Sequence, residues 1–137
     1  MNIDHICIAV KDIKEGLNYW QDVFGYIQMT EPVVNTKQKV RVVFLKKENS
    51  VLVKLIEPLE DNLSLNNFVK RGGGFHHICF KCDDIDEKLA ELKGKGLLSL
   101  VPPQAGEAFG GHDIAFLLAK NGLNIELIDT DIKAGLR

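Results

Sequence analysis

His5-Ile6-Cys7 and His77-Ile78-Cys79 are two copies of one short strand-like stretch, 72 residues apart in the sequence. The same offset relates Asp12-Ile13 to Asp84-Ile85, so the similarity continues beyond the stretch itself. Self-similarity at a fixed offset indicates two copies of one supersecondary unit. The stretch therefore predicts two similar halves related by a pseudo-two-fold axis, with equivalent positions facing each other.

Each copy shows the periodicity of a strand, then a helix, then further strands. Apolar residues at helical spacing follow Lys11-Asp12-Ile13 and end at Gly25, and alternating apolar residues follow from Gln38 to Leu45. We therefore predict an α+β fold of two tandem βαβββ modules with the helices on the outside. The predicted boundaries within this single domain are residues 1–58 for the first module, 59–74 for a connector, 75–131 for the second module and 132–137 for a tail.

The composition is that of an ordinary globular chain and excludes several classes of partner. The chain has 137 residues, 45% of them hydrophobic, and a formal net charge of -2. The lysines are scattered instead of forming a basic stripe, which argues against nucleic acid as a partner. We find no signal-peptide pattern and no apolar run of membrane-spanning length, so we expect a cytoplasmic protein without a membrane partner. The three cysteines lie in strand-like segments and are expected to be buried core residues.

Two segments of the second half carry turn signals. Asn121-Gly122 is typical of a tight β-hairpin. The stretch from Pro102 to Gly111 contains two prolines and three glycines, and we expect it to be an irregular loop that could cover a ligand site as a lid.

Three side chains of the repeated strands are expected on one concave surface. Successive residues of a strand point to opposite faces, so His5, His77 and Glu126 should face away from the helices, opposite to their apolar neighbours. Two imidazoles and one carboxylate form a donor set for one divalent ion such as Ni, Co, Mn, Fe or Zn. By the same alternation, His76 should point to the other face, and His112 borders the irregular segment; neither is placed in the site.

The sequence resembles the vicinal oxygen chelate (glyoxalase/bleomycin resistance) superfamily, and within it the methylmalonyl-CoA epimerases. The similarity covers nearly the whole chain, and its most specific motifs are Asp4-His5-Ile6, Glu57-Pro58-Leu59, Phe75-His76-His77-Ile78, Asp83-Asp84-Ile85 and Ile125-Glu126-Leu127. The resemblance implies a glyoxalase-like fold, with the sheet curved into a barrel-like shape. It also implies that His5, His77 and Glu126 hold the metal, that an enolate is the intermediate, and that the protein forms a homodimer.

The chain departs from the family's pattern at two positions. The position that resembles the family's second catalytic glutamate is Arg41, which stays protonated and cannot accept a proton. The position that resembles the fourth metal ligand is Lys54, the repeat equivalent of Glu126. A protonated Lys54 repels a divalent cation, so it points away, is neutral, or stands in for the metal beside Glu126.

These departures leave several functions open. The first hypothesis is a metal-dependent isomerase, epimerase or lyase that stabilises the enolate of a small oxygenated or acyl-CoA substrate. In it, Glu126 is the catalytic residue, and Arg41 and Lys54 bind the substrate. The second is a metal-free module that binds small molecules, as the bleomycin-resistance members do, with Lys54 neutralising Glu126. The third is a lyase of the glyoxalase I type, which acts on lactoylglutathione.

Overall fold

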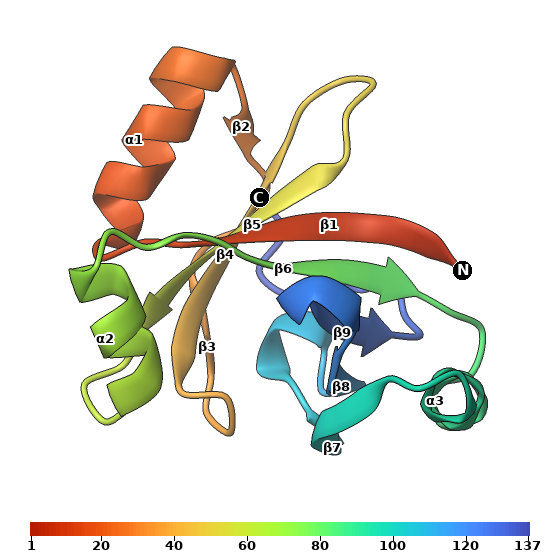
Figure 1. Cartoon of the computed structure of the whole chain (residues 1–137). Coiled ribbons are helices and arrows are strands. Elements are labelled where there is room, and N and C mark those ends of the chain that lie inside the picture. Colours follow the sequence, from red (N-terminus) through yellow and green to blue (C-terminus); the bar gives the residue numbers. More distant parts are fainter.

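The computed structural model describes all residues from 1 to 137 and shows one curved, nine-stranded mixed sheet with three α-helices (Figure 1). None of the helices is both long and apolar enough to cross a membrane. The first half comprises β1 (Asn2–Ala9), α1 (Ile13–Phe24), β2 (Ile27–Gln28), β3 (Val33–Asn35), β4 (Val40–Lys46) and β5 (Leu52–Pro58).

The second half repeats this plan after a connecting helix. Helix α2 (Leu63–Lys70) joins the halves. It is followed by β6 (Gly74–Lys81), α3 (Ile85–Gly94), β7 (Leu98–Ala105), a 3₁₀ turn (Glu107–Phe109), β8 (Asp113–Leu118), a second 3₁₀ turn (Lys120–Gly122) and β9 (Asn124–Ile128). The predicted α+β fold of two tandem modules is thus confirmed, as is the hairpin at Asn121-Gly122, where Asn121 has a φ of 64°.

The two halves are joined through the middle of the sheet. The strand order is β2-β4-β5-β1-β6-β9-β8-β7, with β3 also paired to β4. Strands β1 and β6 pair antiparallel, whereas β1 pairs parallel to β5 and β6 pairs parallel to β9. The first strand of each module therefore lies next to its own last strand and next to the first strand of the other module. This places β5, β1, β6 and β9 side by side.

The start of the long helix in each module is stabilised by the same pair of acidic side chains. Asp12 and Asp84 accept a backbone N–H from the first turn of α1 and α3, respectively. Glu57 and Asp129 accept the N–H of the first residue of the same helices. Both acids recur at the 72-residue offset, so the duplication extends to the side chains that anchor the helices on the outer face of the sheet.

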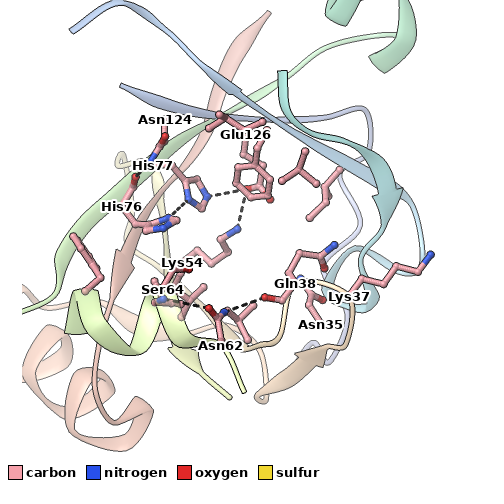
Figure 2. A pocket seen from close by; sticks show the side chains of 18 of the residues that line it. Asn35, Lys37, Gln38, Lys54, Asn62, Ser64, His76, His77, Asn124 and Glu126 are labelled. Atoms are coloured by element: carbon pink, nitrogen blue, oxygen red, sulfur yellow. Dashed lines mark hydrogen bonds and ion pairs between the residues drawn. The ribbon is translucent and has the colours of Figure 1, made fainter. Parts of the chain in front are cut away.

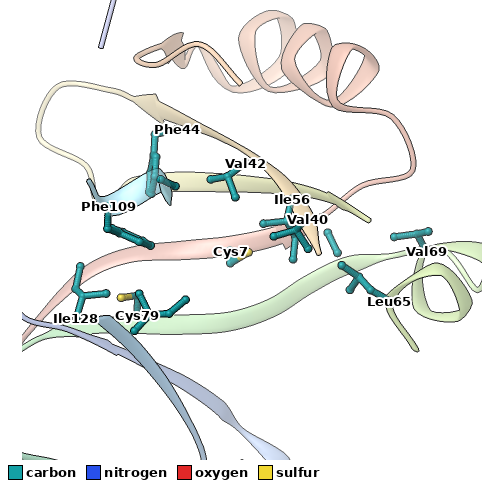
Figure 3. Close-up of a cluster of buried hydrophobic side chains, with 13 residues drawn as sticks. Cys7, Val40, Val42, Phe44, Ile56, Leu65, Val69, Cys79, Phe109 and Ile128 are labelled. Atoms are coloured by element: carbon teal, nitrogen blue, oxygen red, sulfur yellow. The ribbon is translucent and has the colours of Figure 1, made fainter. Parts of the chain in front are cut away.

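Apolar side chains form separate clusters on the two faces of the sheet. On the outer face, Leu17 of α1 packs on residues of β4 and β5, and Ile85 of α3 packs on residues of β8 and β9. The inner face carries a cluster of 13 buried residues (Figure 3). It includes Cys7, Cys79 and Phe109, and all three cysteines of the chain are free and buried, as expected.

Residues 102–111 do not form the expected lid. Strand β7 continues through both prolines to Ala105, and the following turn places Phe109 fully inside the core. Because β7 is the outermost strand of its half, its prolines can lack a backbone donor without breaking a ladder between two neighbours. The turn signals in this segment therefore reflect a sheet edge that bends into the core.

The last residues of the chain are packed against the rest of the fold. The backbone N–H of Ala134 donates to the carbonyl of Ala108, and Leu136 forms an isolated bridge with Thr30. Lys133, beside these contacts, has only 5% of its surface exposed. The C-terminal segment is thus part of the packed structure and brings a charged side chain into the interior.

The glycine run between the halves contains one position at which a side chain would collide with the backbone. Gly73 has a φ of 65°, and a Cβ there would lie 2.5 Å from the carbonyl oxygen of Ala9. We predict that Gly73→Ala lowers the free energy of unfolding by about 3 kcal/mol, because left-handed strain and a backbone clash add together. Gly72→Ala is the control, since Gly72 also has a positive φ but no atom near its Cβ position. Equal losses in urea unfolding would contradict the packing described for Gly73.

Candidate functional site

One carboxylate oxygen lies within hydrogen-bonding distance of side chains from three different strands. Glu126 Oε1 on β9 lies 2.9 Å from His5 Nε2, 3.0 Å from His77 Nε2 and 2.8 Å from Lys54 Nζ. None of the four residues is more than 3% exposed. The structure therefore brings together the three predicted metal ligands and places Lys54, predicted to bind substrate or to stand in for the metal, at hydrogen-bonding distance from Glu126. Figure 2 shows Lys54, His77 and Glu126 at this point.

The four side chains meet because their strands are neighbours and their positions share one face. Lys54 and Glu126 occupy equivalent positions in β5 and β9, and His5 and His77 occupy equivalent positions in β1 and β6. The strand order β5-β1-β6-β9 places them in a row across the join between the halves. Alternation along each strand then directs all four toward the concave side.

A β-bulge precedes each histidine and supplies its second hydrogen-bond partner. In the β1–β6 ladder, Asp4 is an extra residue on β1, and His76 is an extra residue on β6. Asp4 Oδ2 lies 2.6 Å from His5 Nδ1, and His76 Nδ1 lies 2.8 Å from His77 Nδ1. The expectation that His76 points away from the site is therefore wrong, because strict alternation does not hold across a bulge. His112, by contrast, is exposed and lies outside the site.

Neither Asp4 nor His76 is among the site residues predicted from the sequence. The signal that could have found them is their own equivalence, since Asp4 and His76 are separated by the same 72-residue offset as the histidines that follow them. A polar residue immediately before each inward histidine cannot reach that histidine in a regular strand. The bulges, which have no local sequence signature here, make the contact.

The charges of Lys54 and Glu126 stabilise each other inside the protein. Burial alone would raise the pKa of Glu126, but the charge of Lys54 and the hydrogen bonds from His5 and His77 hold it well below its usual range. Burial alone would lower the pKa of Lys54, but the charge of Glu126 outweighs this and raises it above its usual value. The two groups are therefore an ion pair at neutral pH.

A second cation completes a chain of polar contacts that reaches the C-terminal segment. Lys133 Nζ lies 3.2 Å from Asp4 Oδ1 and 5.4 Å from the centre of the Phe44 ring. Burial would raise the pKa of Asp4, but its contacts with His5 and Lys133 lower it instead. The polar contacts run from Lys133 to Asp4, His5, Glu126 and finally Lys54, so they connect the C-terminal segment to the centre of the site.

A cavity of about 630 Å³ opens on one side of this centre. Lys54, His76, His77 and Glu126 line it, whereas His5 is not part of its wall. Five side-chain amides and a set of apolar residues form most of the remaining wall (Figure 2): Asn35, Gln38, Asn62, Gln104, Asn124, Val40, Ile56, Leu65, Phe68, Leu100, Val101, Ile114 and Phe116. Lys37 and Arg71 also line the cavity, and Glu126 is its only carboxylate. The cavity wall is thus positively charged, although the whole chain has a net charge of -2.

Arg41 does not line the cavity, so the prediction that it binds substrate there needs correction. It forms a salt bridge with Glu57, which also accepts the first N–H of α1. Its neighbours Val40 and Val42 point into the inner cluster, and alternation turns Arg41 to the helix-bearing face. In the structure, Arg41 pairs with Glu57, the residue that anchors the start of α1.

The donors at the centre match a divalent ion in type but not in charge. The ligand atoms of His5, His77 and Glu126 lie within 4.8 Å of one another, which suits a two-histidine, one-carboxylate site. The same Glu126 oxygen is bonded to a buried ammonium. At an effective dielectric constant of about 20, a divalent ion about 4 Å from that ammonium is repelled by roughly 8 kcal/mol. The site with Lys54 in this position therefore does not fit a divalent metal ion.

The sequence matches the Glyoxalase/Bleomycin resistance protein/Dioxygenase superfamily over residues 4–116. This match covers most of the chain, and the fold agrees with it, so the chain belongs to this superfamily.

Particular relatives include methylmalonyl-CoA epimerases. The mitochondrial enzyme of Dictyostelium discoideum is 32% identical over 130 residues, which cover 91% of this chain and 76% of the relative. A glutamate-to-glutamine variant of the Streptomyces coelicolor enzyme, solved in complex with 2-nitronate-propionyl-CoA, is 30% identical, with a TM-score of 0.81 and coverage of 96% of this chain and 99% of the relative. A methylmalonyl-CoA epimerase in complex with methylmalonyl-CoA and NH4+ is also 30% identical, with a TM-score of 0.80 and coverage of 96% of both chains.

Loss of the buried cation at Lys133 should destabilise the protein more than loss of a surface cation. We predict that Lys133→Met lowers the free energy of unfolding by about 2 kcal/mol, because Asp4 then keeps a largely buried charge with one partner fewer. Lys81→Met is the matched control, since Lys81 pairs with Asp131 at the surface and should change stability little. Chemical unfolding of both variants checks this, and an equal effect would show that the Lys133–Asp4 contact is unimportant.

The buried histidine of β6 should make stability depend on pH. Burial and the charge of Lys54 lower the pKa of His77 from 6.5 to about 3. The unfolded chain therefore binds a proton below about pH 6.5 that the folded chain does not bind, so the free energy of unfolding falls as pH falls from about 6.5 toward 3. We predict that His77→Gln reduces this slope in chelator-treated protein, whereas substitution of the exposed His112 by Gln does not. Unfolding at pH 7, 6 and 5 measures the slopes, and identical slopes for all three proteins would contradict the prediction.

Proposed function

We propose that this protein is an isomerase that removes a proton from the carbon beside a carbonyl group of a small oxygenated or acyl-CoA substrate. The observation that supports this most is the state of Glu126 at the wall of the cavity. Its Oε1 accepts from three donors, whereas its buried Oε2 has no hydrogen-bond partner. A carboxylate oxygen without a hydrogen-bond partner can accept a proton from a bound ligand, and the adjacent positive charge keeps the carboxylate ionised.

The proposed step moves one proton and one electron pair. The C–H bond beside the carbonyl breaks, the proton goes to Glu126 Oε2, and the electron pair moves to the carbonyl oxygen, which becomes an enolate. Delivery of a proton to the opposite face of that carbon, or to a neighbouring atom of the enolate, completes the isomerisation. The lowered pKa of Glu126 keeps it ionised but makes it a weak base, so the enolate oxygen must be stabilised strongly. Positive charge at the cavity wall supplies this stabilisation.

The charge of the cavity supports an anionic substrate. Lys37, Lys54 and Arg71 line it, opposed only by Glu126. Carboxylate or phosphate groups would complement this wall, and the amide side chains offer further donors. Relatives solved in complex with acyl-CoA molecules support the same class of substrate. The structure solved with methylmalonyl-CoA and NH4+ further indicates that a relative binds its acyl-CoA together with an ammonium ion.

The presence of a single carboxylate in the cavity favours a second candidate function, an isomerisation that uses only one base. Epimerisation through a planar enolate uses a proton acceptor on one face and a donor on the other. Glu126 is the only carboxylate of the cavity, and Arg41 lies on the other face of the sheet. A single base can instead take a proton and return it to a neighbouring atom, as in isomerisation of the glyoxalase I type.

Exchange of the substrate proton with solvent tests proton removal without assuming the product. We predict that the protein catalyses deuterium incorporation beside the carbonyl of methylmalonyl-CoA in D₂O, detected by mass spectrometry. Glu126→Gln should reduce the rate roughly 100- to 10,000-fold, because the amide cannot accept the proton. Glu60→Gln, at an exposed position, should leave it unchanged.

The same experiment separates the isomerase from a small-molecule binding module. Tight binding of the CoA ester without any exchange would contradict the isomerase and favour the metal-free module expected as the second hypothesis. Exchange without inversion of configuration would favour the one-base reaction, whereas exchange with inversion would favour an epimerase.

A further inference from the structure

We propose that the ammonium group of Lys54 takes the place of the divalent ion in this protein. The cation of the site is then a side chain of strand β5. The inference deepens the proposed function, on which it rests, by naming the group that stabilises the enolate oxygen. Lys54 Nζ is 2.8 Å from Glu126 Oε1, and both residues line the cavity.

The hydrogen bonds of the two histidines compete with metal binding in this arrangement. A carboxylate oxygen of ionised Glu126 can only accept, so His5 Nε2 and His77 Nε2, at 2.9 and 3.0 Å, both donate to it. A metal at these ring nitrogens would have to displace both protons and break both hydrogen bonds to Glu126. The bulged residues hold this arrangement from behind, since Asp4 and His76 bond to the Nδ1 atoms of the same rings.

The equivalence of Lys54 and Glu126 shows how the site balances its own charge. The two residues occupy matching positions of the repeated halves and meet near the pseudo-two-fold axis. If both positions carried carboxylates or neutral metal-binding side chains, their free electron pairs could bind a cation from solution. Here one of the two carries the opposite charge, so the pair is neutral without any ion.

The surroundings keep the ammonium group in place. Lys54 is 3% exposed, its neighbour across the β4–β5 ladder is Phe44, and its Nζ lies 5.5 Å from the centre of the Phe109 ring. Glu126 accepts one of its three N–H bonds. The other two are available for an oxygen atom of a ligand in the cavity, where they would stabilise a developing negative charge.

Metal binding tests this assignment without reference to activity. Chelator-treated wild-type protein should bind none of Ni, Co, Mn, Fe or Zn at the site in calorimetric titrations. Lys54→Gln, which removes the charge and keeps a polar group, should bind one ion per chain roughly 100-fold more tightly or better. His77→Ala in the Lys54→Gln background should abolish that binding. Lys81→Gln, at a surface ion pair, is the matched control and should bind no ion.

One bound divalent ion per chain in the wild type, lost in His77→Ala, would overturn the proposal. If Lys54→Gln does not fold, the wild type still decides the question through deuterium exchange. Exchange that survives dialysis against chelator supports Lys54, and exchange that is lost and restored by metal overturns it. Absence of exchange under all conditions would count against the proposed function, whereas the titration of the wild type would still decide which cation the site uses.

Discussion

Glu126 Oε1 is the point on which the structure of the site depends. A buried carboxylate is costly unless its charge is compensated, and here compensation comes from Lys54, His5 and His77, each on a different strand. Because these strands belong to both halves, the carboxylate contacts side chains of both duplicated modules and also lines the cavity. The same bonds engage Oε1 and leave the buried Oε2 without a hydrogen-bond partner.

Most of the fold could be predicted from the sequence because duplication is visible in the residues themselves. The repeat of His5-Ile6-Cys7 at His77-Ile78-Cys79 predicts two modules, and the α+β fold with outer helices is confirmed. The prediction of a lid at residues 102–111 is wrong because prolines and glycines occur both in loops and at sheet edges. Only the place of this segment at the edge of the sheet, which sequence alone does not reveal, makes it a strand. The homodimer stays a prediction.

The site could be predicted only as far as strict alternation holds. Alternation places His5, His77 and Glu126 on the concave face, where the structure has them. It fails at Asp4 and His76, because bulges are set by the pairing of two distant strands.

Two further residues lie beyond what alternation could assign to the site. Alternation could not reveal Lys133, whose approach to Asp4 depends on the path of the C-terminal segment. For Arg41, alternation in fact places the side chain on the helix face, and the resemblance of its position to a catalytic glutamate is misleading.

The most direct test of the central ion pair is nitrogen-15 NMR of the lysine side chains in metal-free protein at neutral pH. The structure predicts a slowly exchanging ammonium signal of Lys54, identified by its loss in Lys54→Gln, that correlates through a hydrogen bond with the carboxylate carbon of Glu126. A Lys54 signal characteristic of a neutral amine, or an ammonium in fast exchange with water and no correlation to Glu126, would contradict the ion pair and the site built around it.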